Sequence, residues 1–476
     1  MRRRAQTLSN LANWQRKLFA PVDIASLVFF RIAFGLLMLW MIKLAWSLDR
    51  ISQWWIEPPF LFKYPGFSWV HPWPGNGLYV HWILLGLFAL FVTVGFLYRI
   101  SAALFFLSHT YFFLLDQGRY VNHTYLICLF SFLWIFVPAH RAFSVDALFR
   151  PRLRSQTVPA WSLWLLRAQM GVVYFFAGVA KIAPDWLHGE PLRTWLKQQI
   201  RYPLLDRVVQ HEWVVHATSF GSLIVDLFVV PFLLWRRTRL AAFCVAVSFH
   251  LLNARIFPLD IFPWLAIAAT TLFLSPSWPR RIISIFRRGI TSPVMETGTL
   301  PPRWKRILIV SFVTLYTAIQ ILVPLRHFFY PGGIEWTYME HRFSWQMMLA
   351  RPVTHTFFYV TDPNTGHEVQ VTPGKYLDLQ QATHMGWRPD MVRQFACFLA
   401  NKMPRLGPKP LRVQVRMYVS VNGRKPRIFL DPNVNLAAEP RSWGRPHWLL
   451  EIHDPLPPPG QDFSREPFGA TPLGID

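Results

Sequence analysis

Nine apolar runs fill the first two-thirds of this chain, and they constrain its fold more than any other feature. They lie near 22–47, 78–97, 100–115, 123–137, 161–182, 214–235, 240–257, 261–275 and 304–325. A helix of about 20 apolar residues crosses the hydrocarbon core of a bilayer, with roughly 17–25 as the usual range. The third, fourth and eighth runs are shorter, which favours tilted or partial spans. The pattern predicts an α-helical polytopic membrane bundle of about nine spans.

Clusters of basic residues indicate how this bundle is oriented. They precede the first run and follow the fourth, sixth and eighth runs. Their members are Arg2, Arg3, Arg4, Arg16 and Lys17; Arg141, Arg150, Arg152 and Arg154; Arg236, Arg237 and Arg239; and Arg280, Arg281, Arg287, Arg288, Arg303, Lys305 and Arg306. With nine spans and a cytoplasmic N-terminus, every cluster is cytoplasmic, as the positive-inside rule requires. We therefore expect an extracytoplasmic C-terminal domain. The short N-terminus is typical of a protein in a plasma membrane of the bacterial inner-membrane kind, and we expect that location.

The charge balance bears on partners and ligands. The formal net charge is +24, yet only 16% of the residues are charged, against about 25% in soluble proteins. Because the basic residues lie beside apolar runs, the charge indicates contact with membrane lipid rather than nucleic acid. The three cysteines, Cys128, Cys244 and Cys397, have no metal-binding spacing and suggest no disulfide framework. No metal site is predicted.

The last third of the chain has the pattern of a small α+β domain. THTFFYVTDPNTGHEVQVTP predicts two strands around a turn, and LRVQVRMYVSV and NGRKPRIFLDP predict two more. PDMVRQFACFLANKM carries a helical apolar stripe. We therefore expect a membrane domain over 1–325 and an extracytoplasmic α+β domain over 326–455. A Pro- and Gly-rich tail, 456–476, is expected to be disordered.

Ionisable residues inside spans are costly, so each is a candidate for function. Lys181 closes the fifth run, and Gly171, Tyr174 and Gly178 share its helical stripe, where small residues let a second helix approach. A lysine that faces the bundle interior is desolvated, which favours the uncharged amine and suits it to act as a base. The alternatives are a lysine that extends to the headgroups, or a pair with Asp185, four residues on.

Two further polar pairs fall near the outer ends of runs. Asn122 and His123 open the fourth run, either as a proton-exchanging group or as a helix cap at the headgroup level. His250 and Asn253 share one helix face in the seventh run, either as ligand contacts or as an interhelical hydrogen bond.

Two charged residues lie deeper in the spans. Arg31 and Asp226, in the first and sixth runs, are expected to be structural, as a buried ion pair. The topology brings Lys181, His123 and His250 to the outer half of the membrane. A pocket there would admit a hydrophobic molecule from the lipid and a polar or peptide substrate from outside.

Several stretches carry a resemblance that extends over nearly the whole chain. They are LYRISAALFFLSHTYFFLLDQGRYVNHTYL, VYFFAGVAKIAPDWLHGEPL, FHLLNARIFPLDIFPW, SPSWPRR, FSWQMMLARP, YLDLQQATHMGWRPDMVRQFACFLA and VSVNGRKPRIFLDP. With these segments in this order, the chain resembles the vitamin K-dependent γ-glutamyl carboxylases and the broader HTTM membrane proteins. The resemblance ends near Ile452, whereas animal members continue into a region that helps engage the protein substrate.

The resemblance implies roles for individual residues. Lys181 matches the lysine taken as the base that deprotonates vitamin K hydroquinone. His123 matches a histidine thought to act on the glutamate carbanion or its protonation, and Asn122 would bind a quinone oxygen. The remaining positions expected around the naphthoquinone are His250, Asn253, Met347 and Met348.

The implied activity is carboxylation of glutamate side chains in a peptide or protein, a carbon–carbon lyase reaction. In this family O2 converts the hydroquinone into a base strong enough to remove the glutamate γ-proton. CO2 then adds to the carbanion, and vitamin K epoxide is the second product. Reduced vitamin K is thus the implied cofactor, with O2 and CO2 as co-substrates. Two alternatives stay open: epoxide formation without carboxylation, and a non-catalytic quinone-binding or transport protein.

Overall fold

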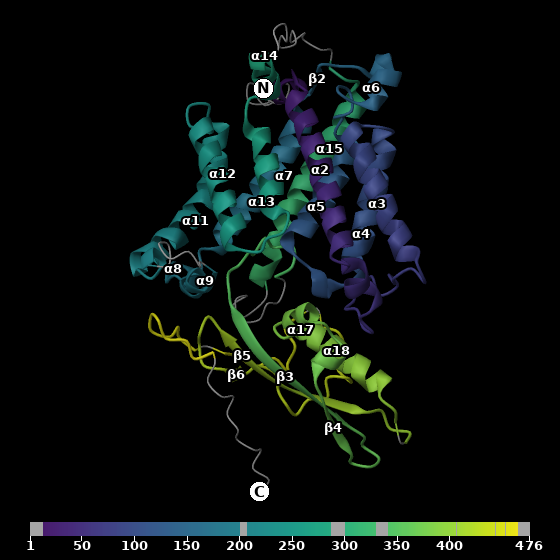
Figure 1. Cartoon of the computed structure of the whole chain (residues 1–476), viewed down its shortest axis with the longest axis vertical. Helices are drawn as coiled ribbons and strands as arrows, with labels where there is room; N and C mark the ends of the chain where they lie inside the picture. The colour runs from purple at the N-terminus through teal and green to yellow at the C-terminus, as the bar shows by residue number, and fades with distance from the viewer. Residues whose placement is uncertain are drawn as a thin grey trace, which may run out of the picture.

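The computed structural model describes residues 13–199, 207–286, 300–329, 341–405, 407–442, 444–452 and 454–464. A bundle of helices forms one part of the molecule, and a sheet domain made by the C-terminal third lies against one end of it (Figure 1). The short segments β2, α6 and α14 lie at the opposite end of the bundle. The expected fold class, a polytopic helical bundle with a small α+β domain, is confirmed.

Helices occupy all nine apolar runs in the described parts of the chain. Seven are long and apolar enough to cross a membrane: α2 (Ala25–Ser47), α3 (Gly77–Val94), α4 (Tyr98–Leu115), α7 (Ala160–Ala180), α11 (Glu212–Leu234), α12 (Arg239–Ile256) and α15 (Arg303–Leu325). The fourth and eighth runs form shorter helices, α5 (Asn122–Phe136) and α13 (Phe262–Thr270), the latter extended by the 3-10 turn η4 (Thr271–Phe273). The third run, expected to be short, forms an 18-residue helix.

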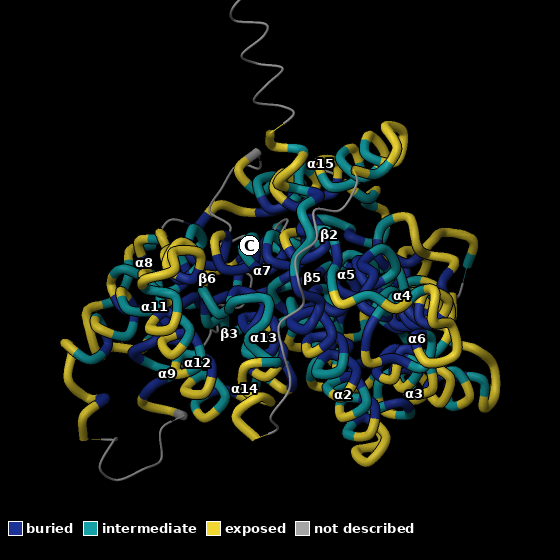
Figure 2. The backbone as a smooth tube through the Cα atoms, turned by 90° about the horizontal axis from the view of Figure 1, so that it is seen from above, coloured by how far each residue is buried: buried dark blue, intermediate teal, exposed yellow. Residues whose placement is uncertain are grey.

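Aromatic side chains fill the centre of the bundle. Phe30 and Phe34 of α2 pack edge-on against Phe130 of α5, with ring centroids 5.2 and 6.5 Å apart, respectively. Offset and edge-to-face pairs of this kind stabilise beyond the area that they bury. The buried residues gather in the middle of the bundle, and the exposed ones lie on the outer helices (Figure 2). The outward residues are apolar, such as Leu84 and Leu107, as a lipid-facing surface requires.

Arg31 does not pair with Asp226, so the expected buried ion pair is wrong. Its guanidinium instead donates hydrogen bonds to the carbonyl oxygens of Ala139, at 2.7 Å, and of Phe143. Arg31 lies on the second turn of α2, near the end of the bundle where α6 (Val145–Phe149) is found, whereas Asp226 contacts the far end of α7. The arginine thus satisfies the carbonyls of the connection that follows α5, which would otherwise be buried without partners.

The C-terminal domain is a four-stranded antiparallel sheet with the strand order β4-β3-β5-β6. Its strands are β3 (Pro352–Thr361), β4 (Glu368–Val371), β5 (Arg412–Val421) and β6 (Arg427–Ile428). The helices α17 (Leu379–Met385) and α18 (Pro389–Lys402) cover one face, where Phe395 packs edge-on against Phe358 of β3 at 5.0 Å. The predicted hairpin and the predicted helix are confirmed, and α17 is an additional helix between them.

The first part of the expected tail is held in place by the sheet domain. The backbone N–H of Phe463 donates to the carbonyl of Gly423 at 2.9 Å, and Asp462 pairs with Arg351 at 2.8 Å. The disorder predicted for 456–476 is therefore wrong up to Ser464, because the turn between β5 and β6 supplies partners for this segment. Residues 465–476 lie outside the described residues.

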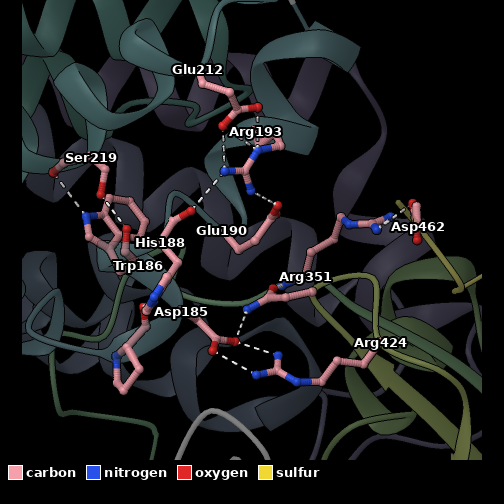
Figure 3. A network of polar contacts seen from close by, with 12 residues as sticks. Asp185, Trp186, His188, Glu190, Arg193, Glu212, Ser219, Arg351, Arg424 and Asp462 are labelled. Carbon is pink, nitrogen blue, oxygen red and sulfur yellow. Dashed lines mark hydrogen bonds and ion pairs between the residues drawn. The ribbon is translucent and has the colours of Figure 1, made fainter. Parts of the chain in front are cut away.

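A buried ion pair joins the sheet domain to the bundle (Figure 3). Arg424, just after β5, donates to both oxygens of Asp185 at 2.6 and 2.8 Å, and Asn422 donates to the same carboxylate at 2.7 Å. Asp185 lies in the short helix α8 (Pro184–Leu187), and both charged side chains are about 90% buried or more. A carboxylate with this many donors holds the two domains at a defined spacing.

We expect Arg424→Met to loosen the C-terminal domain from the bundle, because it leaves Asp185 buried without its counter-charge. Removal of one partner of a buried pair costs about 3–5 kcal/mol. Thermal unfolding in detergent should show a fall of several degrees, and limited proteolysis should cut between the domains sooner. As a control, Arg427→Gln removes an arginine whose partner, Asp454, holds it at the surface. Equal losses for the two variants would contradict this role of the buried pair.

Candidate active site

A cavity of about 750 Å³ lies where the ends of the membrane helices meet the C-terminal domain. Its wall comes from α5, α7, α11 and α12 of the bundle, and from two segments near 346–350 and 380–388. All seven residues predicted for the site line this cavity: Asn122, His123, Lys181, His250, Asn253, Met347 and Met348. The structure therefore brings together side chains from four parts of the sequence.

Lys181 ends helix α7 and is held by an ion pair. Its Nζ donates to Asp226 Oδ2 at 2.6 Å and to the carbonyl of Ala177 at 3.3 Å, and it lies 5.2 Å from the centre of the Trp186 ring. Lys181 is only 6% exposed. The expectation that it faces the interior is confirmed, but the alternative pair with Asp185 is wrong, because Arg424 and Asn422 occupy that carboxylate.

The close approach of α11 explains why Asp226 reaches the amine. A Cβ added at Gly178 of α7 would lie 2.7 Å from the Leu227 side chain and 2.9 Å from its backbone nitrogen. Because glycine carries no side chain there, α11 packs directly on the last turn of α7. Asp226, the neighbour of Leu227, is thereby placed beside Lys181. The stripe of small residues predicted this contact between helices without identifying the charged partner.

The helix α8 fixes the aromatic ring beneath the amine. Trp186 donates from Nε1 to the carbonyl of Ser219 on α11 at 3.1 Å, and the Ser219 hydroxyl donates back to the carbonyl of Trp186 (Figure 3). Asp185, the preceding residue, is anchored by Arg424. The indole that faces Lys181 is therefore held from both sides, by the bundle and by the C-terminal domain.

His250 lines the cavity at the end of a chain of hydrogen bonds. With the Thr270 hydroxyl donating to the carbonyl of Ala266 at 2.7 Å, we assign the Tyr174 hydroxyl as the donor to Thr270 Oγ1, at 3.0 Å. Tyr174 then accepts from His250 Nε2, at 2.7 Å. In a neutral imidazole the other nitrogen is an acceptor. His250 Nδ1 is that acceptor, and it has no hydrogen-bond partner among the described residues.

Asn122 and His123 open α5 at the same cavity. The Asn122 amide accepts from the Tyr120 hydroxyl and donates to the carbonyl of Gln346, each at 3.0 Å. Asn122 therefore ties the bundle to the segment that precedes the sheet. The His123 ring lies 6.4 Å from that of Phe262. Asn253, in the last turn of α12, accepts through its backbone carbonyl from Phe257 at the end of that helix.

The segment that carries Met347 and Met348 is strained. Phe343, Trp345 and Met348 all have positive φ, at 66°, 58° and 56°. Bulky residues in this region cost on the order of 1–3 kcal/mol each and persist only where the surroundings hold them. Trp345 is held by Tyr125 of α5, whose ring stacks on it at 5.2 Å. This conformation presents both methionines to the cavity.

The contribution of Arg388, from the C-terminal domain, was not predicted from the sequence. Arg388 is 4% exposed and lines the cavity, yet its Nε and Nη1 have no hydrogen-bond partner among the described residues. Burial lowers the pKa of Arg388 to about 10, and the neighbouring Arg342 adds to this effect. The residue lies in the stretch QQATHMGWRPDM, which the resemblance covered without assigning a role to it.

Two family models match the chain. The model of the HTTM domain matches residues 19–278, and the model of the lumenal domain of vitamin K-dependent gamma-carboxylase matches residues 305–455. The chain belongs to the vitamin K-dependent gamma-carboxylase family. The family resemblance stated from the sequence is confirmed. No solved structure matches the chain significantly. As a family member with apolar spans and a lumenal-type domain, the protein is an integral membrane carboxylase with an extracytoplasmic domain.

Membership in this family implies the use of vitamin K hydroquinone, and the cavity fits such a molecule. Its volume of about 750 Å³ lies within the range of roughly 300–1,000 Å³ typical of small-molecule sites. Much of its wall is apolar, with Met170, Val173 and Phe249 among the lining residues. Its donors and acceptors include His250 Nδ1 and the Lys181 amine. Within the described residues no cluster of three or more His, Cys, Asp or Glu side chains is placed to hold a metal ion.

We expect His384, which lines the cavity, to make the stability of the C-terminal domain depend on pH. Its Nδ1 donates to the carbonyl of Gly118 at 2.5 Å, and burial, with Arg388 nearby, lowers its pKa to about 3. Below the ordinary histidine pKa of about 6.5 the unfolded chain gains a proton that the folded one does not. The free energy of unfolding therefore falls as the pH is lowered from 6.5 toward 3, by up to about 1.4 kcal/mol per pH unit.

Unfolding temperatures between pH 7.5 and 5 would test this expectation. His384→Gln keeps a donor for Gly118 and removes the titrating group, so its unfolding temperature should fall less steeply with acid than that of the unchanged protein. The matched control is His447→Gln, at a largely exposed position near Glu439. Parallel curves for all three proteins would contradict the role of His384.

Proposed function

We propose that the protein carboxylates glutamate side chains of a peptide or protein, coupled to oxygenation of vitamin K hydroquinone to its epoxide. The observation that carries the proposal is that one cavity joins a buried lysine, several histidines and a buried arginine, Arg388, two of whose nitrogens have no hydrogen-bond partner in the described parts of the chain. A glutamate γ-proton is too weakly acidic for an ordinary side chain to remove. The hydroquinone supplies, with O2, the strong base that this reaction needs.

The hydroquinone is bound at the bundle side of the cavity in this proposal. His250 Nδ1, fixed as an acceptor by Tyr174, takes a hydrogen bond from one hydroxyl of the ring. Met347, Met348 and Asn253 lie along the same space, and Asn122 holds the segment that presents the methionines. Lys181 faces the bound ring as the base that accepts a hydroxyl proton. The apolar wall keeps water out, which preserves the reactivity of the groups inside.

The glutamate enters from the side of the C-terminal domain. Arg388 is buried, and its Nε and Nη1 have no hydrogen-bond partner among the residues that the structure describes. A carboxylate ligand would satisfy these N–H groups in a charge-assisted pair. The γ-carboxylate of the substrate is therefore held there, with its γ-carbon turned toward the hydroquinone. His123, at the start of α5, is the group proposed to act on the carbanion or its protonation. The N-terminus of the chain is cytoplasmic in this arrangement, and the peptide is captured on the outer side of the membrane.

Lys181→Met should abolish both products, because it removes the base that starts the reaction. A positioned general base contributes on the order of 10²–10⁴-fold. The test uses purified protein in detergent with reduced vitamin K, labelled bicarbonate and a Glu-containing peptide, and it measures epoxide by chromatography and label on the peptide. Lys197→Met is the matched control, since it removes an exposed lysine on the same side of the bundle.

The pattern of products separates the possible functions. Fixed label together with epoxide supports the proposal, whereas epoxide without fixed label would mean hydroquinone oxygenation alone. Neither product, in an assay where an established carboxylase works, would leave a non-catalytic quinone-binding or transport protein. Unchanged epoxide output from Lys181→Met would remove this lysine from the role of base.

Arg388→Met should weaken peptide binding and leave hydroquinone binding intact. A hydrogen bond to a charged group contributes about 1.5–3 kcal/mol, so the KM for the peptide should rise by roughly 10–100-fold. Competition with a Gln-containing peptide provides a sharper readout: the unchanged protein should prefer Glu, and the variant should lose this preference. Arg388→Lys keeps the charge and should fall between the two. A Glu preference that survives in Arg388→Met would place the substrate carboxylate elsewhere.

A further inference from the structure

The ion pair between Lys181 and Asp226 poses a chemical problem for the proposed base. The two charged atoms are 2.6 Å apart, and their side chains are 7% and 6% exposed. An amine must lose its extra proton before it can accept another one from a hydroquinone. A neighbouring carboxylate favours the ammonium form. The sequence predicts a desolvated, uncharged amine as the base, with a pair to Asp185 as one alternative. The observed pair with Asp226 is neither of these, so this lysine must work in a different way.

A buried amine without a partner would be a poor base for this substrate. Desolvation alone disfavours the ammonium, so the proton would be held weakly. Phenol-type hydroxyls release a proton only near pH 10, and a base that is much weaker leaves the transfer uphill. The best general base has a proton affinity matched to its task. A nearby carboxylate stabilises the ammonium that forms as the O–H bond breaks and the N–H bond is made.

We propose that Asp226 is a positioning residue that holds the Lys181 amine toward the cavity and stabilises the ammonium that forms when this amine takes a proton from the hydroquinone. This inference rests on the proposed function. Asp226 touches Lys181 and has no other hydrogen-bond partner among the described residues. The close packing at Gly178 leaves the carboxylate little freedom to move away. The pair therefore acts as one unit, in which the carboxylate never needs to contact the substrate.

Other charged or titratable groups near the amine are already engaged or lie across the cavity. On α8, Asp185 is occupied by Arg424. On α7 and α12, Tyr174 and His250 bond to each other. The remaining groups along the cavity wall are Tyr120, His123, Asp260, His341, His384 and Arg388. Within the described residues Asp226 is thus the carboxylate that contacts Lys181 directly.

Asp226→Asn tests the proposal because it keeps the shape and removes the charge. An amine that loses an opposite charge at this distance releases its proton at a pH that is lower by roughly 1–3 units. The acid limb of the pH–rate profile for epoxide formation should therefore move to lower pH by that amount. The maximal rate should fall by on the order of tenfold or more, because the amine becomes a weaker base. Asp226→Glu, which keeps the charge, should hold the limb in place while misplacing the amine and lowering the rate.

A second readout does not require enzyme turnover. Acetic anhydride is small and uncharged and reacts only with the free amine, so acetylation of Lys181, followed by mass spectrometry, reports its deprotonated fraction at each pH. The exposed Lys197 of the same molecules serves as the internal reference. In Asp226→Asn the labelling of Lys181 should begin at lower pH than in the unchanged protein. Asp116→Asn, which removes a buried carboxylate that does not line the cavity, should leave the labelling curve unmoved.

The two readouts distinguish failure of this inference from failure of the proposed function. Shifted labelling in a protein that makes no epoxide would leave the Lys181–Asp226 coupling standing and remove the enzymatic proposal. If epoxide forms but Asp226→Asn and the unchanged protein have the same labelling curve and the same acid limb, only the role of Asp226 is overturned. No labelling of Lys181 in either protein up to pH 10 would show that the amine does not reach the cavity, which also overturns it. Asp226→Ser serves the same purpose should Asp226→Asn not be recovered folded.

Discussion

The contact between Asp185 and Arg424 is the interaction on which the rest of the site depends. Asp185 follows Lys181 by four residues, and it precedes the tryptophan whose ring lies against the amine. Its carboxylate is bound by the turn after β5, so the end of α7 and the C-terminal domain cannot move independently without exposing a buried charge. A bundle of helices alone would leave the lower ends of α5, α7, α11 and α12 open to water. The ion pair closes that opening and turns it into a cavity.

Charge is distributed unevenly along this cavity, and the distribution suits two different ligands. The bundle side offers apolar side chains together with polar groups such as the His250 imidazole and the Asn253 amide, which can orient an aromatic ring. The outer side offers the guanidinium of Arg388, whose Nε and Nη1 have no hydrogen-bond partner in the described part of the chain. An anionic ligand therefore binds most favourably at the outer side. A neutral ring costs little free energy to remove from water, so it is suited to the bundle side. Lys181 and Asp226 lie in the wall with a net charge of zero as a pair, so they repel neither ligand.

Much of the architecture was predictable from the sequence because the bilayer leaves few choices. Each apolar run near 20 residues had to be a helix, since an open backbone in lipid costs several kcal/mol for each unpaired group. The stripe that contains Gly178 and Lys181 also predicted where a second helix would approach, and α11 is found there. The positions of His123, His250 and Lys181 around one cavity followed from the alternation of the spans. Topology alone brought their ends to the same side.

The partners of the charged residues were not predictable in the same way. Asp185 lies one helical turn after Lys181, and the spacing suggested a pair, but the chain leaves the helix at Lys181 and the carboxylate turns toward Arg424. Arg31 and Asp226 both lie inside apolar runs, but toward opposite ends of the bundle. Their positions within the runs therefore did not predict whether the two side chains form an ion pair.

Nothing in the sequence pattern around Arg388 indicated a functional role. An arginine in a soluble segment has no desolvation penalty until the fold buries it. Its burial arises from tertiary structure. The helix α17 contacts the loop after α4 at Gly118, and the turn that follows α17 places the guanidinium where water cannot hydrogen-bond to its Nε and Nη1. Burial of a cation whose N–H groups lack partners costs free energy, and a ligand that supplies an anion to Arg388 would offset that cost.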